Sequence, residues 1–519
     1  MSSRSVAFLL LVSFGAVELC AQKSPVTVEV LRLEAAIDQA LANNLGLVTA
    51  RYRPANALDD VLIEQAAFDP ELFGSISGSE SLSAAKGSLL DPALVPESEN
   101  RGSKMGVVKS FATGASVTVN TGISRDSSNN NAARNPDYAG NVGVSLRQPL
   151  LKDAWFKVNL APLARARVAA AQSVFELRSD ILDVISATEI GYWNLAYSRA
   201  ELALIASSIE LAENLLEENR ERERLGLITP LEVLQAETEL VNQQEDVIQA
   251  ERAIEDAEDV LRQVMGTASF LDALEGDIAV RSLPIELPEL RPMAVIVRDT
   301  MLADADAQAQ ERAIEVQRIN KILAEDETKP NLDLTADVNY LGRGTDGRTA
   351  YRGAYNASGY NWNVGLELRF PLGFREARAR VRQSERNLER ETVRLYDIKQ
   401  QKALAARNAW RAVNAGRKRI EVTRTALLLN EETFEQERAR FGSGLVAYRQ
   451  VLEAQRDFDR ARSNSLSAII DTLRATVRLS RVDGTILARN GFSWETIDAL
   501  SEASDLKAHP ILKDIKLNP

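Results

Sequence analysis

The chain has almost none of the residues on which metal sites and most enzymes depend. Its 519 residues include one cysteine and one histidine. Zinc sites, disulfide frameworks and histidine-dependent catalysis each need several such residues in a fixed arrangement. The sequence also offers no nucleophile-base pair and no phosphate-binding glycine loop. We therefore expect no enzymatic activity, no cofactor and no metal site, which leaves binding, scaffolding or transport.

Basic residues and aromatic residues are also scarce. Lysine and arginine total 62 against 74 aspartates and glutamates, for a formal net charge of -12. This balance argues against a nucleic-acid partner, which would be held by cationic contacts to phosphate. Aromatic residues make up 6% and hydrophobic residues 45% of the chain. With abundant alanine, leucine, glutamate and arginine, this composition favours long helices around a sizeable core.

Long apolar runs are missing as well. The apolar stretch 6–17 follows Arg4 and is too short to span a bilayer, so residues 1–21 are expected to be a secretory signal peptide cleaved after Ala21. Cys20 leaves a lipoprotein signal open, although Glu18 and Leu19 stand where small residues are usual. No later run of about 18 apolar residues follows. The exported chain is then soluble or forms a β-barrel.

Several segments of the sequence occur twice in the same order. Residues 141–150 match 363–372 at seven of ten positions, Ala-Arg-Ala-Arg-Val at 164–168 recurs at 377–381, and 226–236 resembles 444–454. Such order indicates an internal duplication. We expect a first repeat at 22–265, a proline-containing connector at 266–292, a second repeat at 293–487 and a tail at 488–519, each repeat holding short helices, a strand pair and a long helical hairpin.

Four segments alternate polar and apolar residues as strands do, at 71–83, 141–150, 331–342 and 361–372. Their length of about ten residues suits a tilted transmembrane strand. Asp333, Asp337, Glu367 and Arg369 would then face a watery lumen, whereas in a soluble sandwich the apolar face would point inward. The stretch 104–123 could form a further hairpin, which would raise the count from four to six strands per chain.

Directly after each strand pair the period becomes helical. Leu195, Leu202, Ile209 and Leu216 recur at seven-residue spacing, as do 381, 388 and 395 and then 413, 420, 427, 434 and 441. Strict heptads of this length predict coiled-coil packing, in helices of about sixty residues and about 90 Å. Glycines end each run, and a second helix of roughly forty residues follows, to 265 and to about 481.

Counting strands then predicts an oligomer. Four tilted strands cannot close into a barrel, and an open sheet edge is not stable in lipid. Three chains would supply twelve strands and six helical hairpins around one axis. The predicted fold is therefore mostly α with a small β part and internally duplicated, in which a trimeric α-helical tunnel continues from a transmembrane β-barrel of about four strands per chain.

This order of elements resembles the TolC family of outer-membrane channel proteins. The shared features are the signal peptide, the strand ends with Pro-Leu, the Gly-x6-Val-Leu-x-Ala turn motif at 226–236 and 444–454, and the duplication, over roughly residues 31–487. The resemblance implies a homotrimer with a twelve-stranded barrel in outer-membrane lipid and a periplasmic tunnel. It implies the exit duct of a tripartite efflux pump or of a type I secretion system, docked to a periplasmic adaptor (membrane fusion) protein and driven by an inner-membrane transporter.

The resemblance also implies two sets of functional residues. Acidic side chains that narrow the periplasmic entrance would correspond to Glu232, Gln450 and Glu453, although Gln450 departs from the usual aspartate; the alternative is that they are solvated helix positions. The hairpin tips would receive the adaptor, the alternative being packing within the chain. The predicted docking residues are Leu225, Gly226, Leu227, Ile228, Phe441, Gly444, Leu445 and Val446.

Two further interpretations concern the barrel rim and the function. Tyr340, Tyr351, Tyr355, Tyr360 and Trp362 are expected to form an aromatic girdle at the outer interface. A periplasmic coiled-coil adaptor or structural protein without a pore is the competing function. That alternative explains the heptads but not two strand pairs placed before both hairpins.

Overall fold

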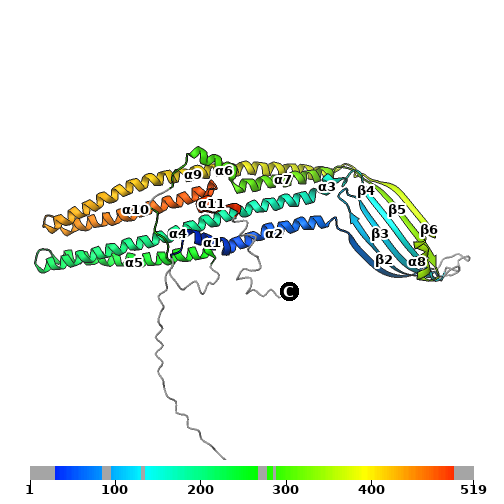
Figure 1. Cartoon of the computed structure of the whole chain (residues 1–519), viewed down its shortest axis with the longest axis horizontal. Coiled ribbons are helices and arrows are strands. Elements are labelled where there is room, and N and C mark those ends of the chain that lie inside the picture. The colour runs from blue at the N-terminus through cyan, green and yellow to red at the C-terminus, as the bar shows by residue number, and fades with distance from the viewer. Residues whose placement is uncertain (1–29, 85–94, 130–134, 267–277, 285–287, 496–519) are drawn as a thin grey trace, which may run out of the picture.

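In the computed structural model the described residues, 30–84, 95–129, 135–266, 278–284 and 288–495, form an elongated molecule. Long helices occupy one end and a curved sheet the other (Figure 1). The predicted signal peptide with Cys20 lies outside these residues, as do most of the predicted connector and most of the tail. None of the helices among the described residues is sufficiently long and apolar to cross a membrane.

The two halves of the chain contain corresponding helices. The first half holds α1 (Leu33–Asn43), α2 (Leu45–Ala66), α3 (Phe156–Asn159), α4 (Ala161–Arg224) and α5 (Pro230–Met265). The second holds α6 (Met293–Ala303), α7 (Ala305–Asp326), α8 (Gly347–Tyr355), α9 (Arg375–Gly442), α10 (Tyr448–Val482) and α11 (Ile486–Arg489). In both halves an 11-residue helix is followed by one of 22 residues. The side chain of the N-cap residue starts the longer helix in each case, Asn44 accepting from Leu47 N and Asp304 from Ala307 N.

The sheet has six strands, not the four predicted. They are β1 (Glu71–Leu82), β2 (Glu97–Ser110), β3 (Ser116–Ser128), β4 (Asp137–Pro149), β5 (Asn331–Gly344) and β6 (Gly359–Arg369). All pairs are antiparallel and the order follows the chain. The further hairpin that the sequence left open at 104–123 is therefore present, as part of β2 and β3. Its apolar signal is weak because β2 carries only Met105, Val107 and Val108 among polar residues and glycines.

Four helices continue the sheet as one layer. Along this layer α2 packs on α4, α4 on α7 and α7 on α9, while β1, β4, β5 and β6 extend from the same end (Figure 1). The other ends of α4 and α9 reverse into α5 and α10, as the heptads predicted. Contacts between α4 and α10 join the two hairpins.

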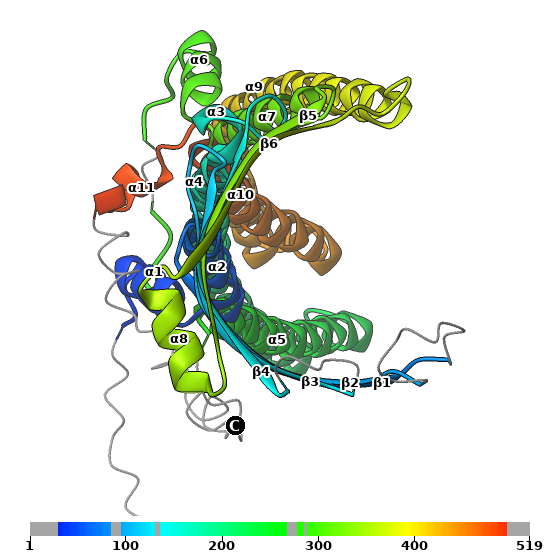
Figure 2. The same ribbon diagram turned by 90° about the vertical axis from the view of Figure 1, so that its right-hand side faces the viewer.

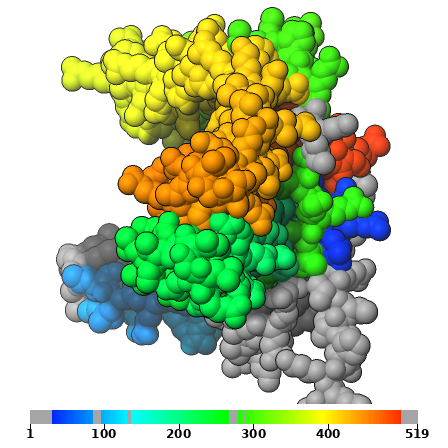
Figure 3. All heavy atoms as spheres, turned by 90° about the vertical axis from the view of Figure 1, so that its left-hand side faces the viewer, coloured from blue at the N-terminus to red at the C-terminus, as the bar shows by residue number. Residues whose placement is uncertain are grey.

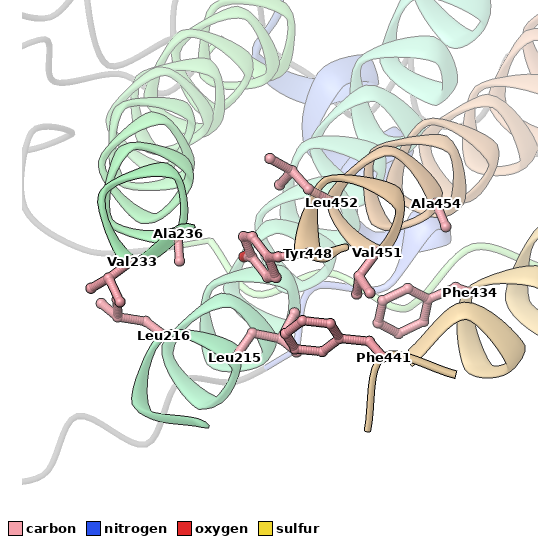
Figure 4. Packing of buried hydrophobic residues seen from close by; sticks show 10 residues of the cluster. All are labelled: Leu215, Leu216, Val233, Ala236, Phe434, Phe441, Tyr448, Val451, Leu452 and Ala454. Atoms are coloured by element: carbon pink, nitrogen blue, oxygen red, sulfur yellow. The ribbon is translucent and has the colours of Figure 1, made fainter. Parts of the chain in front are cut away.

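A buried apolar cluster near the reversals holds the two hairpins together (Figure 4). The cluster includes Leu215 and Leu216 of α4, Val451 of α10 and Phe434 of α9, and the ring of Phe434 stacks on that of Phe458 with centroids 5.9 Å apart. Burying such side chains contributes about 1.5–3 kcal/mol each. Of the predicted heptad positions, Leu216, Phe434 and Phe441 contribute to this packing, and the rest of the cluster comes from other positions of the four helices.

Candidate functional site

The sheet has a mainly apolar face and a mainly polar face, and the charged exceptions on the apolar face, Glu99, Arg101 and Arg125, lie at the end of β2 and β3 distant from the long helices. Cross-strand partners lie on the same face of a sheet, and successive residues alternate between faces. Leu334, Ala336 and Val338 of β5 are opposite Leu366, Val364 and Trp362 of β6, and Val338 is opposite Val144 of β4. The same face includes Leu72 and Ile76 of β1, Met105 and Val107 of β2, and Val117, Val119 and Ile123 of β3.

The four residues predicted to face a lumen share the opposite, polar face. Asp333 is the register partner of Glu367, and Asp337 lies four residues further along the same strand, on the same face. Arg147 Nη2 donates to Asp333 Oδ2 at 2.8 Å, while Arg369 Nε donates to Glu367 Oε1 at 2.8 Å. This face therefore pairs opposite charges and stays polar along its length.

A short helix, α8, covers the apolar face at the end of the sheet distant from the long helices. Viewed along the molecule, α8 lies on the convex side of the sheet (Figure 2). Gly140 and Gly342 allow its approach: a Cβ at Gly342 would lie 2.1 Å from the carbonyl oxygen of Ala350, and Ala350 is fully buried. The sequence analysis did not predict this helix. The one signal for it was that glycines, Gly140, Gly342 and Gly344, occupy apolar-face positions of the two strands beneath it.

Aromatic side chains gather at this same end. Tyr340 and Tyr360 are register partners on the apolar face, and Trp362 follows on β6. All three are exposed, as are Tyr351 and Tyr355 of α8. The arrangement has the form of an aromatic girdle, in which rings with one polar edge sit at a membrane-water interface.

The three predicted gate residues lie on the helices that follow the reversals, and two of them have local partners. Glu232 closes a capping box, accepting from Thr229 N at 2.9 Å. Glu453 is exposed and accepts from Arg449 Nε at 2.9 Å. Gln450 is exposed one turn before Glu453. Glu232 thus has a structural task at the start of α5.

The tips themselves are two neighbouring lobes, one from each hairpin (Figure 3). Gly226 has φ +70° and Gly444 has φ +72°, a backbone conformation that favours glycine. Leu225, Leu227 and Leu445 are exposed by about two thirds or more of their surface, 67%, 69% and 71% respectively.

Phe441 was predicted to be exposed together with the other docking residues, and the exposure was wrong. Its side chain is 3% exposed because it packs in the cluster between the hairpins. Ile228 and Val446 are partly buried against the same cluster. Within the predicted set, the most exposed apolar side chains of the tips are therefore the leucines Leu225, Leu227 and Leu445.

Arg222 is a tip residue that the sequence reasoning missed. Its guanidinium lies 4.4 Å from the ring centroid of Phe441, and Nη1 donates to the carbonyl oxygen of Phe441 at 2.9 Å. Glu218 accepts from Nη2 at 2.9 Å. One side chain of α4 thus clamps the end of α9, through a cation-π contact and a charge-assisted hydrogen bond.

A partly buried polar contact joins the same two hairpins further from the tips. Ser208 Oγ of α4 donates to Asp459 Oδ1 of α10 at 2.7 Å. Burial raises the pKa of Asp459, although the hydrogen bond from Ser208 and the charge of Arg462 oppose the rise. Burial also raises the pKa of Tyr448 to about 12, so that this phenol is neutral in the core.

These features define a class of protein. A sheet with a lipid-like apolar face, a charged opposite face and an aromatic rim is built as part of a membrane channel wall, and the helical layer prolongs that wall. The particular family follows from the sequence. The model of the outer membrane efflux protein family matches residues 112–267 and 300–485, which is well over half of the chain and falls once in each repeat. The chain belongs to this family, so it is an outer-membrane efflux channel and not an enzyme.

Solved structures show the same fold. The CmeC outer membrane channel of Campylobacter jejuni is similar with a TM-score of 0.69 at 18% identity, over 91% of this chain and 89% of that one. The outer membrane protein VceC of Vibrio cholerae gives 0.64 at 16% identity, over 87% and 96%. The open state of the MtrE channel of Neisseria gonorrhoeae gives 0.61 at 18%, over 87% and 89%. No curated protein matches the sequence at a significant level.

Proposed function

We propose that three copies of the chain form the exit duct through which substrate passes passively from the periplasm to the outside. The observation that carries the proposal is the sheet, which has one apolar and one charged face but two open edges, β1 and β6. Open edges are not stable in lipid, and pairing β1 of one copy with β6 of the next removes them. The charged face then lines water and the apolar face meets lipid.

The tips of the helical hairpins indicate which proteins the duct binds. Leu225, Leu227 and Leu445 expose apolar surface at the tips, which fits the helices of a periplasmic adaptor better than bare solvent. The adaptor in turn links the duct to an inner-membrane transporter of an efflux pump or of a type I secretion system. The predicted docking set is thereby reduced to three leucines presented by the turns at Gly226 and Gly444.

Cysteine cross-linking in cells tests the docking. Cysteines at Leu227 and Leu445 should capture an adaptor, whereas a cysteine at Glu251, exposed on α5 away from the tips, should capture none. Failure of both tip cysteines to capture any periplasmic adaptor would reject docking at these leucines.

The gate of the duct is proposed to include Glu453. Three copies of this exposed carboxylate would lie around the axis, where they attract cations. Arg449 at 2.9 Å offsets part of this charge within each copy. We expect Glu453→Ala to lower cation selectivity in a planar-bilayer recording, and Glu251→Ala to leave it unchanged. An unaltered selectivity ratio in the Glu453 variant would remove this residue from the gate.

Membrane fractionation distinguishes the duct from a periplasmic coiled-coil protein without a pore. The duct should be recovered with the outer membrane, migrate differently before and after heating, and conduct in a planar bilayer. Recovery in the soluble periplasmic fraction, with no conductance, would support the competing function.

A further inference from the structure

The β2–β3 hairpin is the part of the sheet that a twelve-stranded duct leaves unexplained. β1 follows α2, β5 follows α7, and β4 and β6 each lead into a long helix. Those four strands therefore continue the four helices of the layer. In contrast β2 and β3 continue no helix, because a turn at 111–115 connects them directly at the helical end of the sheet.

This turn is fixed to the junction between the sheet and α4. The carbonyl oxygen of Thr113 accepts from Trp155 N at 2.9 Å and from Gln148 Nε2 at 3.2 Å. Gly114 has φ +86°, and a Cβ there would lie 2.3 Å from the carbonyl oxygen of Asp153. The β2–β3 hairpin is therefore packed against the rest of the protein at its turn, next to the start of α4.

Pairing makes β2 and β3 necessary to the sheet. β1 pairs with β2 from Glu71–Val108 to Leu82–Glu97, and β3 pairs with β4 from Ser116–Arg147 to Asp126–Asp137. β1 has no other strand partner among the described residues. Leaving the hairpin outside a barrel would thus break the ladder that holds β1.

The apolar face continues through the half of the hairpin nearest its turn; further out, Glu99 and Arg101 of β2 and Arg125 of β3 share this face and form ion pairs there. Met105 and Val107 of β2 lie beside Thr121 and Val119 of β3, and Val119 lies opposite Val144 of β4. In a strand that crosses lipid, only the side chains on the lipid-facing side need to be apolar. β2 and β3 carry such side chains there, as do the neighbouring strands β1 and β4.

The widths of the two layers agree with six strands. Four helices packed about 9.5 Å apart span about 38 Å around an axis. Strands about 4.8 Å apart and tilted by about 40° take about 6.3 Å each around the axis, so that six span about 38 Å and four only about 25 Å. Six strands continue the helical layer without narrowing, whereas four would require a taper.

We propose that the trimer closes an eighteen-stranded barrel, since three copies of a six-stranded sheet supply three times six strands. The proposal rests on the trimeric duct proposed above. Barrel diameter grows roughly linearly with strand number, so the barrel is about 1.5 times wider than one of twelve strands, in the range that leaves an aqueous channel.

Thiol accessibility tests the proposal on the intact trimer in liposomes. Cys20 is the only cysteine in the sequence, so a Cys20→Ser background carries no other thiol. Single cysteines are placed at neighbouring positions on opposite faces and treated with a membrane-impermeant maleimide. The pairs, with the polar-face residue first, are Lys104 and Met105 in β2, Thr118 and Val119 in β3, and Asp337 and Val338 in β5 as the reference.

We expect the polar-face cysteine of each hairpin pair to react at least tenfold faster than its neighbour, as in the β5 pair. Equal reactivity of both faces in β2 and β3, while the β5 pair still differs, would overturn the eighteen-stranded barrel and leave a twelve-stranded duct. Loss of the contrast in β5 itself, or absence of the trimer band, would instead contradict the trimeric duct.

Discussion

At the scale of single residues, the tips separate side chains that hold the hairpins together from those free to meet a partner. Phe441 is buried with Arg222 on its ring, while Leu227 projects from the neighbouring turn. Both are large and apolar and lie next to a glycine turn. Their difference is set by the opposing hairpin, which only the structure shows.

Substitution should distinguish the two residues. Phe441→Ala leaves a cavity and is expected to cost about 3–5 kcal/mol of unfolding free energy. Leu227→Ala should change stability by about 0.5 kcal/mol or less while weakening adaptor capture. Thermal unfolding of the purified protein measures the first effect. If Phe441→Ala melted like the wild type, the packing of the two hairpins at this cluster would be wrong.

Asp459 should make the stability of the folded protein depend on pH, and its raised pKa fixes the direction of that dependence. Because burial raises its pKa, the folded protein binds this proton more tightly than the unfolded chain. Ionised Asp459 therefore destabilises the fold at neutral pH, and this cost is relieved as the pH falls through the raised pKa toward the ordinary carboxyl range. Asp459→Asn removes that dependence.

We expect the melting temperature of the wild type to rise relative to that of Asp459→Asn when the pH falls from 7 to 5. The comparison cancels the titration of the other carboxylates, which both proteins share. Parallel pH profiles for the two proteins would show that Asp459 does not titrate with folding.

At the scale of elements, α8 is held on the sheet by backbone contact. Gly342→Val would place new atoms against Ala350 and Ala354, whose backbone already lies close to Gly342. Arg348 and Arg352 already have exposed side chains within α8, and we expect the variant to release this helix so that trypsin cleaves after them in the intact trimer. Gly78→Ala on β1 is the control, since a Cβ at Gly78 has open space within 4 Å. Equal cleavage of both variants would mean that these glycines do not seat α8.

The sequence predicted the elements whose signal is periodic and missed those defined by contacts. Heptads located both hairpins, and Phe441 already occupied a heptad position, so periodicity was the better guide to its burial. β2 was left open because Ser103 and Lys109 flank Met105 and Val107, its only two apolar residues on that face, and pairing with β1 and β3 supplies what its own pattern lacks. The nine-residue helix α8 depends on glycines in β4 and β5, which no local pattern reveals.

At the scale of the whole molecule, the edges of the sheet should meet between copies. A cysteine at Ser75, Ser77 or Ser79 in β1 combined with one at Asn363 in β6 places thiols on the polar face of both edges. Directly opposite residues of paired strands have Cβ atoms about 4.5–5.5 Å apart, within the reach of a disulfide after small adjustment. We expect at least one combination to give a covalent trimer that reductant reverses. No cross-link with any combination would contradict closure through β1 and β6.

The central claim is that three copies of this chain build one continuous duct, and electron cryomicroscopy of the detergent-purified protein tests it most directly. We expect a threefold particle in which a single axial channel runs from a closed β-barrel into a tube of six helical hairpins. A monomeric particle, or an assembly whose helices enclose no channel continuous with the barrel, would contradict it.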